Sequence, residues 1–485
     1  MEVDGETAFV YMAVVDGSNV HNGSFVHIPL HPGQQREVVV TLLEPGVWPH
    51  KAAALRPEPV AATAPLPRVA SADSEGHKWK FTVGGPLRAV LEFGDAYQLG
   101  SFSSGLMVFA DLADPAPPSP TDPGVTYFGP GVHLLEEQPS WSIDKGSRGL
   151  QLQSHSTLYL AEGAVVLGVV RAYNVQNVSI RGRGILAAAF LPGAAFPPGA
   201  AQCQYCMCGG DHVVEIVNGT DITVEGVTLM HSTSWNLKLQ SLQRVHVHGV
   251  KVLAWRCWGD GIDVVSSQEV LIEDVFIRSD DDSIAVKGMD PTMDTSGLTV
   301  RDSVLWNQRF GNCMEIGFEL FNPQIHNISF ERNVCLHQSG SIMSIHNGGQ
   351  AAVHDVRYTD IVAQTLAPSA MGYQAKGCRG NGCLMLFDLS VVFGQYCRVG
   401  PPPKGDGCTD PSLRGSIADI SMMNIEVQTN GVPYIFSQLG GNSTGHGVSG
   451  VTLAGIKLDG RAAATLGDLN ATENAFVSGV RVLPN

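Results

Sequence analysis

Three stretches of the chain share one pattern: Ile222-Thr-Val224-Glu-Gly-Val227, Val245-His-Val247-His-Gly-Val250 and Val270-Leu-Ile272-Glu-Asp-Val275. In each, two alternating apolar residues are followed by a polar pair or by a polar residue and a glycine, and then by a third apolar residue. Since strand side chains alternate between two faces, the apolar set points to one side and the intervening pair turns the chain. The starts lie 23 and 25 residues apart, which is typical of a solenoid with one such strand in each coil.

Looser copies extend the repeat in both directions: Val178-Ser-Ile180, Leu298-Thr-Val300, Ile328-Ser-Phe330, Val356-Arg-Tyr358, Ile420-Ser-Met422 and Val451-Thr-Leu453. A constant strand motif with variable spacing indicates coils that carry loops of different length on one face. We therefore predict an all-β fold in which residues 125–485 form a parallel β-helix of about ten coils. A β-propeller, with about four strands in every 40–50 residues, is the weaker alternative.

The region before the repeat differs in composition. Residues 114–124 contain five prolines in eleven positions, which excludes a helix or a central strand and predicts a stiff linker. In residues 1–113, short apolar runs separated by turn signals predict a small β-sandwich. Within the repeat, residues 187–212 and 363–416 are long insertions, and such insertions commonly build the walls of a binding cleft.

The charge of the chain limits its partners. A net charge of −16 argues against nucleic acid and anionic membranes, and mildly against a polyanionic substrate unless a local basic cleft overrules it. No apolar run is long enough to span a bilayer. Nothing in the sequence calls for a metal or another cofactor, and we expect a monomer.

Cysteine usage bears on the compartment. Three of the ten cysteines crowd into residues 203–208, and four more, Cys378, Cys383, Cys397 and Cys408, fall in the second insertion. Together with six Asn-x-Ser/Thr sites, this favours disulfides and a secreted protein of the extracellular space or cell wall over a zinc protein, although no signal peptide is visible at Met1.

Four aspartates carry the chemistry: Asp260 in the stretch Trp258-Gly-Asp-Gly-Ile-Asp263, and the run Asp280, Asp281 and Asp282. Asp260 and Asp281 are 21 positions apart, close to one coil, so stacking should bring their carboxylates side by side. Like charges held together disfavour joint ionisation, and one pKa should rise. A protonated carboxyl beside an ionised one is what hydrolysis of a glycosidic bond requires. The pattern therefore predicts an enzyme that cleaves polysaccharides.

The segment from Gly259 to Val264, followed by Ser279-Asp-Asp-Asp-Ser-Ile-Ala-Val-Lys287-Gly288, resembles the polygalacturonase clan, glycoside hydrolase families 28 and 49. The family pattern is Asn-Thr-Asp-Gly-Ile-Asp and, about twenty residues later, Gly-Asp-Asp-Cys-Ile-Ala-Ile-Lys. Tyr127-Phe-Gly-Pro-Gly-Val132, Arg181-Gly-Arg-Gly-Ile185 and Ser232-Thr-Ser-Trp235 are similar to other parts of the fold. The resemblance implies a right-handed β-helix, and a preceding β-sandwich is similar to the layout of the dextranase family.

The resemblance also implies a mechanism, inverting hydrolysis, with Asp281 as general acid and with Asp260 and Asp282 jointly activating water. An inverting pair needs carboxyls about 6.5–9.5 Å apart to leave room for that water. Adjacent Asp281 and Asp282 can both face the site only from a turn or bulge, because strand side chains alternate. The alternative for the acidic run is a solvated turn or a calcium site.

Five further residues are candidates for substrate binding: Trp258, Lys287, Asn312, Glu315 and His346. Trp258 is the strongest candidate for an aromatic sugar platform among Trp235, Trp255, Trp258 and Trp306, although packing in the core is an equal alternative for tryptophan. Glu315 could bind hydroxyls or pair with Arg309.

Two departures from the family concern specificity. Asn312 stands where polygalacturonases have the histidine of Gly-His-Gly, and the basic Arg-Ile-Lys that binds galacturonate is absent. We therefore expect an α-linked neutral, dextran-like polysaccharide, with pectin hydrolysis as the alternative. Two rivals stay open: a lyase, which would need calcium ligands and an arginine base, and a non-catalytic carbohydrate-binding solenoid whose acids hold metal.

Overall fold

A computed structural model describes residues 1–13, 23–43, 52–58, 66–74, 76–93, 97–98, 101–102, 105–136, 148–188, 212–254, 258–307, 311–364, 384–391, 414–429 and 435–484. The chain divides into two compact units, Met1–Pro117 and Pro118–Asn485. In the described ranges, no helix is long and apolar enough to cross a lipid bilayer.

The first unit is a sandwich of two five-stranded sheets. The first sheet has the order β2 (Glu6–Thr7), β1 (Glu2–Val3), β5 (Arg36–Thr41), β8 (Lys78–Val83) and β7 (Ala70–Ser71). The second has the order β3 (Tyr11–Ala13), β4 (Gly23–Leu30), β12 (Gly105–Leu112), β9 (Leu87–Phe93) and β6 (Ala53–Arg56); β10 (Tyr97–Gln98) and β11 (Ser101–Phe102) form a separate hairpin. Alternating apolar residues of both sheets, such as Val38, Phe81 and Val108, form one buried core.

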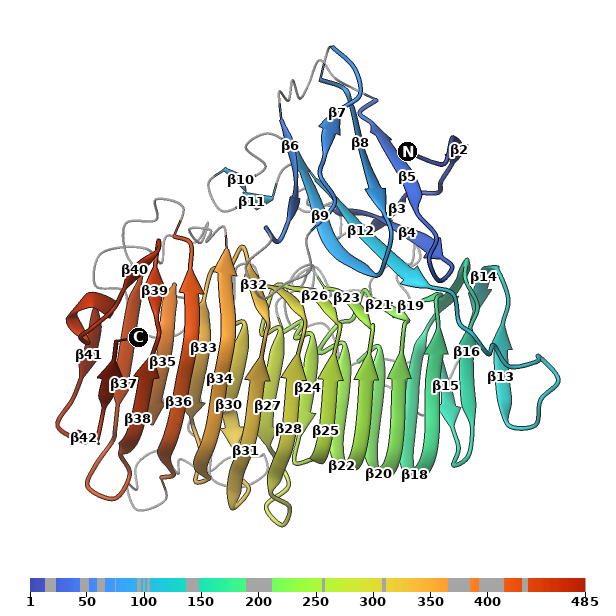
Figure 1. The fold of residues 1–485 in the computed structure, drawn as a ribbon. Coiled ribbons are helices and arrows are strands. Elements are labelled where there is room, and N and C mark those ends of the chain that lie inside the picture. Colours follow the sequence, from blue (N-terminus) through green and yellow to red (C-terminus); the bar gives the residue numbers. More distant parts are fainter. Residues whose placement is uncertain are drawn as a thin grey trace, which may run out of the picture. The chain divides into compact units, whose positions relative to one another are not determined.

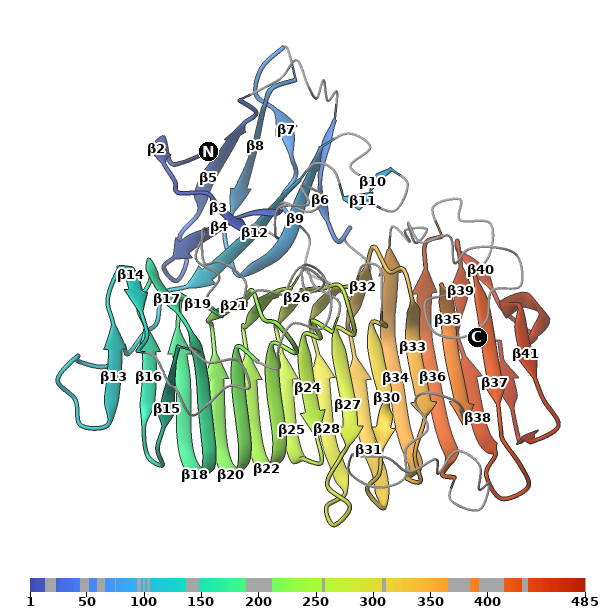
Figure 2. The same ribbon diagram turned by 180° about the vertical axis from the view of Figure 1, so that it is seen from behind.

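The second unit is a β-helix in which parallel strands of successive coils stack into three sheets (Figures 1 and 2). The sheet that carries the sequence repeat contains β13 (Val125–Phe128), β16 (Thr157–Leu160), β18 (Val169–Gly182), β20 (Val214–Glu225), β22 (Leu237–His248), β25 (Gln268–Glu273), β28 (Thr295–Arg301), β31 (Gln324–Glu331), β34 (Ala352–Gln364), β36 (Ser416–Val427), β38 (Val448–Ala454), β42 (Val477–Ser478) and β43 (Arg481–Leu483).

The second sheet lies one corner further along each coil. It contains β14 (Gly131–Leu134), β17 (Ala164–Leu167), β19 (Ile185–Ala187), β21 (Thr228–Met230), β23 (Lys251–Leu253), β26 (Phe276–Ser279), β29 (Val304–Asn307), β32 (Val334–Leu336), the ends of β34 and β36, and β39 (Lys457–Leu458), which pairs with β40 (Arg461–Ala462).

Strands of the third sheet begin just after Asp260 and Asp282. It contains β15 (Gly149–Leu152), the first halves of β18, β20 and β22, β24 (Ile262–Val265), β27 (Ile284–Gly288), β30 (Met314–Leu320), β33 (Ser341–Asn347), β35 (Met385–Val391), β37 (Phe436–Gly440) and β41 (Ala471–Glu473); a 3₁₀ turn, Gly467–Leu469, precedes β41. The predicted all-β fold, a right-handed parallel β-helix after a small β-sandwich, is confirmed.

The corner after the repeat strand explains the middle of the sequence pattern. Gly226, Gly249, Asp274, Asp302 and Arg332 occupy it in successive coils, and their φ angles are 75°, 63°, 52°, 54° and 52°. This left-handed conformation suits glycine and is tolerated by aspartate. The Gly or Asp that follows each repeat strand of the quoted stretches therefore suits this corner, and Arg332 adopts the same conformation in a later coil.

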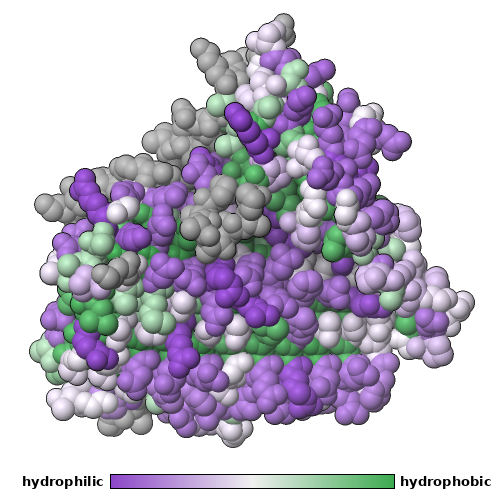
Figure 3. All heavy atoms as spheres, viewed as in Figure 1, coloured by the Kyte–Doolittle hydropathy of each residue, from purple (hydrophilic) through white to green (hydrophobic). Residues whose placement is uncertain are grey.

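The inward apolar residues form one continuous core through the coils, and Val224, Val247 and Ile272 are fully buried in register. A disulfide joins Cys313 to Cys335 inside the coil, so the prediction of disulfide bonding is confirmed for this pair. The two cysteine clusters predicted to be bridged lie outside the described residues. On the face shown in Figure 3, hydrophilic residues predominate, and apolar residues form a band along the stack.

Candidate active site

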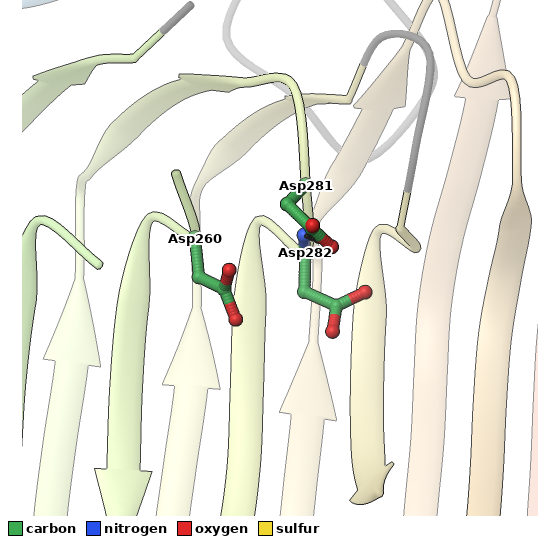
Figure 4. A group of neighbouring side chains, drawn as sticks. All are labelled: Asp260, Asp281 and Asp282. Carbon is green, nitrogen blue, oxygen red and sulfur yellow. Dashed lines mark hydrogen bonds between the residues drawn. The ribbon is translucent and has the colours of Figure 1, made fainter. Parts of the chain in front are cut away.

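Asp260 and Asp282 occupy the same position in neighbouring coils. Each stands two residues before Ile262 or Ile284, and these two isoleucines are paired in register between β24 and β27. Figure 4 shows their carboxylates projecting in the same general direction, with Asp281 beside Asp282. Stacking of coils therefore brings together residues that are 22 positions apart in the sequence.

The chain leaves regular strand geometry at the adjacent pair. Asp281 and Asp282 lie in the turn between β26 and β27. Two side chains fix this turn: the hydroxyl of Ser279 and the Nδ2 of Asn307 donate to the carbonyl oxygen of Asp281, at 2.7 and 2.6 Å. Because the residues are not in a strand, neighbouring side chains can face the same site.

The three carboxylates form one cluster. One oxygen from each of Asp260, Asp281 and Asp282 lies within 4.8 Å of the others. Asp260 and Asp282 are each 3% exposed, and Asp281 is half-buried. The oxygens approach more closely than the 6.5–9.5 Å expected of an inverting pair and are nearer to the roughly 5–5.5 Å that is usual for retaining enzymes.

Asp280 does not belong to this cluster. Its side chain and that of Arg278 are both completely buried and form an ion pair through the Nη1 of Arg278. The same Nη1 donates to the carbonyl oxygen of Ala254 at 2.8 Å, and the guanidinium lies 5.5 Å from the ring centre of Trp306. The run of three aspartates thus divides between an internal ion pair and the site.

The pKa values of all three carboxyls in the cluster are raised. Burial raises the pKa of Asp260 and of Asp282 well above the usual range, and neighbouring carboxylates raise both further. Burial also raises the pKa of Asp281, but the backbone N–H groups of Trp258 and Asp282, which donate to its carboxylate at 3.0 Å, oppose the rise. The sequence predicts one raised pKa, whereas all three rise because all three carboxyls are desolvated.

Lys287 provides a positive charge inside the cluster. Its Nζ lies 3.2 Å from Glu319 Oε2, 3.7 Å from Asp260 Oδ2 and 3.9 Å from Asp263 Oδ1. It also lies 4.9 Å from the ring centre of Trp235. Burial raises the pKa of Asp263 to about 8, against the opposing effect of Lys287. The raised pKa favours the protonated form of Asp263, which extends the acidic site by one residue of the quoted motif.

Asn312, Glu315 and His346 are connected to the cluster from the adjacent coils. The backbone N–H and the Nδ2 of Asn312 donate to Asp282 Oδ1 at 2.6 and 3.2 Å, and the same Nδ2 donates to Glu315 Oε2 at 2.9 Å. His346 Nδ1 contacts Glu315 at 3.0 Å. All three residues are at most 2% exposed. Direct contact with substrate stays a prediction for them, and their burial favours an indirect role.

Trp258 is an exposed aromatic residue beside Asp281, to which its backbone N–H donates. It is 48% exposed and has a φ of +60°, a conformation that is rare for a bulky residue and often marks functional strain. Trp306 is fully buried, and Trp235 stacks on His212. Trp255 and Arg309 lie outside the described residues. Trp258 is thus the described tryptophan whose placement suits a sugar platform.

Three residues were missed by sequence reasoning: Asp263, Glu319 and Asp388. All three lie on strands of the third sheet, and Asp263 and Asp388 occupy outward positions between inward apolar residues, such as Phe387 and Leu389 around Asp388. A search for acids at alternating positions of the strands next to the aspartate motif would have found Asp263. Asp388 lies on β35, inside the stretch 363–416 that the sequence predicts to be an insertion, and no spacing rule connects it to the site.

The comparisons with known proteins agree with this geometry. A family model described as glycosyl hydrolases family 28 matches residues 142–382, which is 241 of the 485 residues. A "Probable polygalacturonase" from Vitis vinifera is 25% identical over 155 residues, which cover 31% of this chain and 26% of the relative. The match thus spans about a quarter of the length of that curated relative.

Two solved structures share the fold. Dex49A from Penicillium minioluteum has a TM-score of 0.67 and 14% identity, and the alignment covers 97% of this chain and 85% of that one. A hyperthermoactive exopolygalacturonase from Thermotoga maritima has a TM-score of 0.51 and 13% identity, over 75% and 84% of the two chains. Fold, aspartate site and family model together place the chain among the glycoside hydrolases. Within them it resembles the polygalacturonase/dextranase clan.

Proposed function

We propose that this chain hydrolyses an α-linked polysaccharide by direct displacement with inversion, without a cofactor. Asp281 is the general acid, and Asp260 and Asp282 together activate the attacking water. The observation that carries the proposal is the cluster itself: three carboxylates from two adjacent coils, each with an oxygen within 4.8 Å of the others. Glycosidic hydrolysis needs such a group, in which one carboxyl is protonated and another is ionised.

Exposure supports these roles. Asp260 and Asp282 are buried side by side at equivalent positions of two coils, as expected of two groups that hold one water between them. Asp281 is the most exposed of the three and lies beside exposed Trp258, whose N–H it accepts. It is therefore the carboxyl best placed to reach a leaving oxygen. Burial raises the pKa of all three carboxyls, so position and exposure, and not pKa, carry the assignment of Asp281 as the acid.

The short oxygen distances support a second candidate, double displacement with retention. Carboxyls about 5–5.5 Å apart are usual where one of them attacks the sugar directly. Direct displacement is favoured here because the cluster contains two aligned bases, Asp260 and Asp282, whereas a single nucleophile would suffice for retention. The anomer of the first product distinguishes the two mechanisms.

The basic side chains near the cluster favour a neutral substrate, because they are already engaged by carboxylates of the protein. Among the described residues around the cluster, Lys287, Arg278 and His346 each already contact carboxylates of the protein. A galacturonate carboxylate would compete with those contacts, and the net charge of −16 would oppose its approach. The alternative, hydrolysis of pectin, is supported by the family 28 match and by the relative named as a probable polygalacturonase.

The experiment is incubation with dextran, pullulan, galactan and polygalacturonan, with detection of new reducing ends and with NMR of the first anomer released. We expect one neutral glycan to be cleaved and its product to appear with inverted configuration. Retained configuration would establish double displacement instead, and cleavage of polygalacturonan alone would refute the neutral substrate. Unsaturated products would identify a lyase.

The non-enzymatic alternative is a binding solenoid whose acids hold a divalent cation, which the spacing of the three carboxylates also permits. We expect neither EDTA nor added calcium to change the melting temperature or the hydrolytic rate, since Lys287 already provides positive charge to the cluster. A melting temperature that falls in EDTA and recovers with calcium would favour the metal-holding alternative.

We also propose that the enzyme acts outside the cell. The disulfide between Cys313 and Cys335 supports this location, because disulfides persist in oxidising compartments.

A further inference from the structure

We propose that Glu315, His346 and Asp388 form a buried chain that positions Asn312 and, through its amide, the carboxylate of Asp282. The proposal rests on the proposed function, in which Asp282 helps to activate water. The chain crosses three coils, because Glu315 lies on β30, His346 on β33 and Asp388 on β35. These residues act through Asn312 and Asp282 and do not touch the sugar.

Asn312 is the link to the catalytic cluster. Register places it one coil beyond Asp282, since Ile284 pairs with Met314. Its side chain is held at both ends: the Nδ2 donates to Asp282 Oδ1 and Glu315 Oε2, and the Oδ1 accepts the N–H of Ser341 at 2.9 Å. These partners fix the orientation of the amide. By accepting the second amide hydrogen, Glu315 keeps the Nδ2 of Asn312 directed at Asp282, whose Oδ1 also accepts the backbone N–H of Asn312.

Glu315 in turn needs a partner for its charge. It is completely buried, and an isolated buried carboxylate is strongly disfavoured. The hydroxyl of Ser344 donates to its Oε2, and His346 Nδ1 lies 3.0 Å from both of its oxygens. An imidazolium at this position lies against the carboxylate that accepts the hydrogen bond of Asn312.

The far end of the chain holds the histidine. His346 Nε2 forms an ion pair with Asp388 Oδ2 at 3.1 Å, without the alignment of a full hydrogen bond. The ring also stacks on Phe318, with ring centres 4.7 Å apart. Burial lowers the pKa of His346, but the two carboxylates outweigh burial and raise the pKa well above its usual range. Two buried carboxylates contact the two nitrogens of one ring and so fix its orientation.

The chain also sets the electrostatic environment of Asp282. The titratable groups that face this residue are Asp260, Asp281, Lys287 and Glu315. After burial, the charge of Glu315 is the largest cause that raises the pKa of Asp282, while Lys287 lowers it. A carboxylate with a higher pKa is a stronger base once it is ionised.

The test is the Glu315→Gln variant of the full chain, assayed on the glycan that the wild type cleaves. We expect kcat to fall about tenfold, KM to change less than about twofold, and the acidic limb of the pH profile of kcat/KM to move about one unit lower. Asp388→Asn should change the same quantities in the same direction but less. A raised KM with unchanged kcat would mean that Glu315 contacts the sugar. An acidic limb that does not move would overturn the proposed positioning role.

Asn333→Ala is the matched control for lost stability. Asn333 is fully buried and bonds to Val300 and Ser303 at another corner of the coil. This variant should lower the melting temperature while leaving the pH profile unchanged. An equal shift of the profile in the control would show that the Glu315 effect is only structural.

A double-mutant cycle keeps the outcome separate from the proposed function. Asp282→Asn, Glu315→Gln and the double variant are compared by urea unfolding at pH 7, which needs no substrate. Since both side chains accept hydrogen bonds from the same Asn312 amide, we expect the double variant to differ from the sum of the two single effects. Additive shifts of the urea midpoint would overturn the proposed link between Glu315 and Asp282 even if hydrolysis is confirmed. Full activity of Asp281→Asn would overturn the proposed function and leave the cycle standing.

Discussion

Replacing Asp281 by asparagine is expected to lower kcat by about 10²- to 10⁴-fold, the usual contribution of a general acid or base. An amide cannot deliver a proton to the leaving oxygen. The fold should be unaffected, because Asp281 is half-buried and an asparagine oxygen can still accept the N–H of Trp258. The measurement is kcat on the cleaved glycan together with the melting temperature of the same preparation.

The control is Asp290→Asn. Asp290 lies just after β27, and its carboxylate is bonded to Thr292, outside the cluster. This variant should keep full activity. Full activity of Asp281→Asn would instead show that the acid assignment is wrong, and Asp260→Asn and Asp282→Asn would then have to be compared to find the proton donor.

The architecture could be predicted from the sequence because a coil repeats the same physical requirement many times. Alternating apolar residues such as Ile222 and Val224 must face the core in every coil, and the corner after them needs a residue that tolerates positive φ. One coil of separation predicts that Asp260 and Asp281 stack side by side. The register instead pairs Asp260 with Asp282, one residue further on, and Asp281 joins them from the turn.

The connections beyond one coil could not be predicted. Glu315 contacts His346, and His346 contacts Asp388. Insertions of variable length separate the strands, so the distance between these residues in the sequence does not reveal which positions are in register. The distribution of protons was also hidden: spacing shows that carboxyls meet, whereas burial decides that Asp260, Asp281 and Asp282 all have raised pKa values. Burial depends on the whole fold, and no short motif records it.

Asp280→Asn should show that adjacent aspartates serve different ends. Asp280 and Arg278 are both fully buried, and the substitution removes the carboxylate charge that Arg278 contacts. Breaking a buried ion pair by changing one partner typically costs about 3–5 kcal/mol of unfolding free energy. We therefore expect a clear drop in the urea midpoint of the β-helix, in contrast to the unchanged midpoint of Asp281→Asn one residue away.

The double variant Arg278→Met with Asp280→Asn separates charge from shape. Arg278 also donates to Ala254 and packs over Trp306, and methionine can keep part of that packing while removing the buried charge. The double variant should therefore be more stable than Asp280→Asn alone. Unfolding of Asp280→Asn at the same urea concentration as the wild type would show that the ion pair does not stabilise the turn before Asp281.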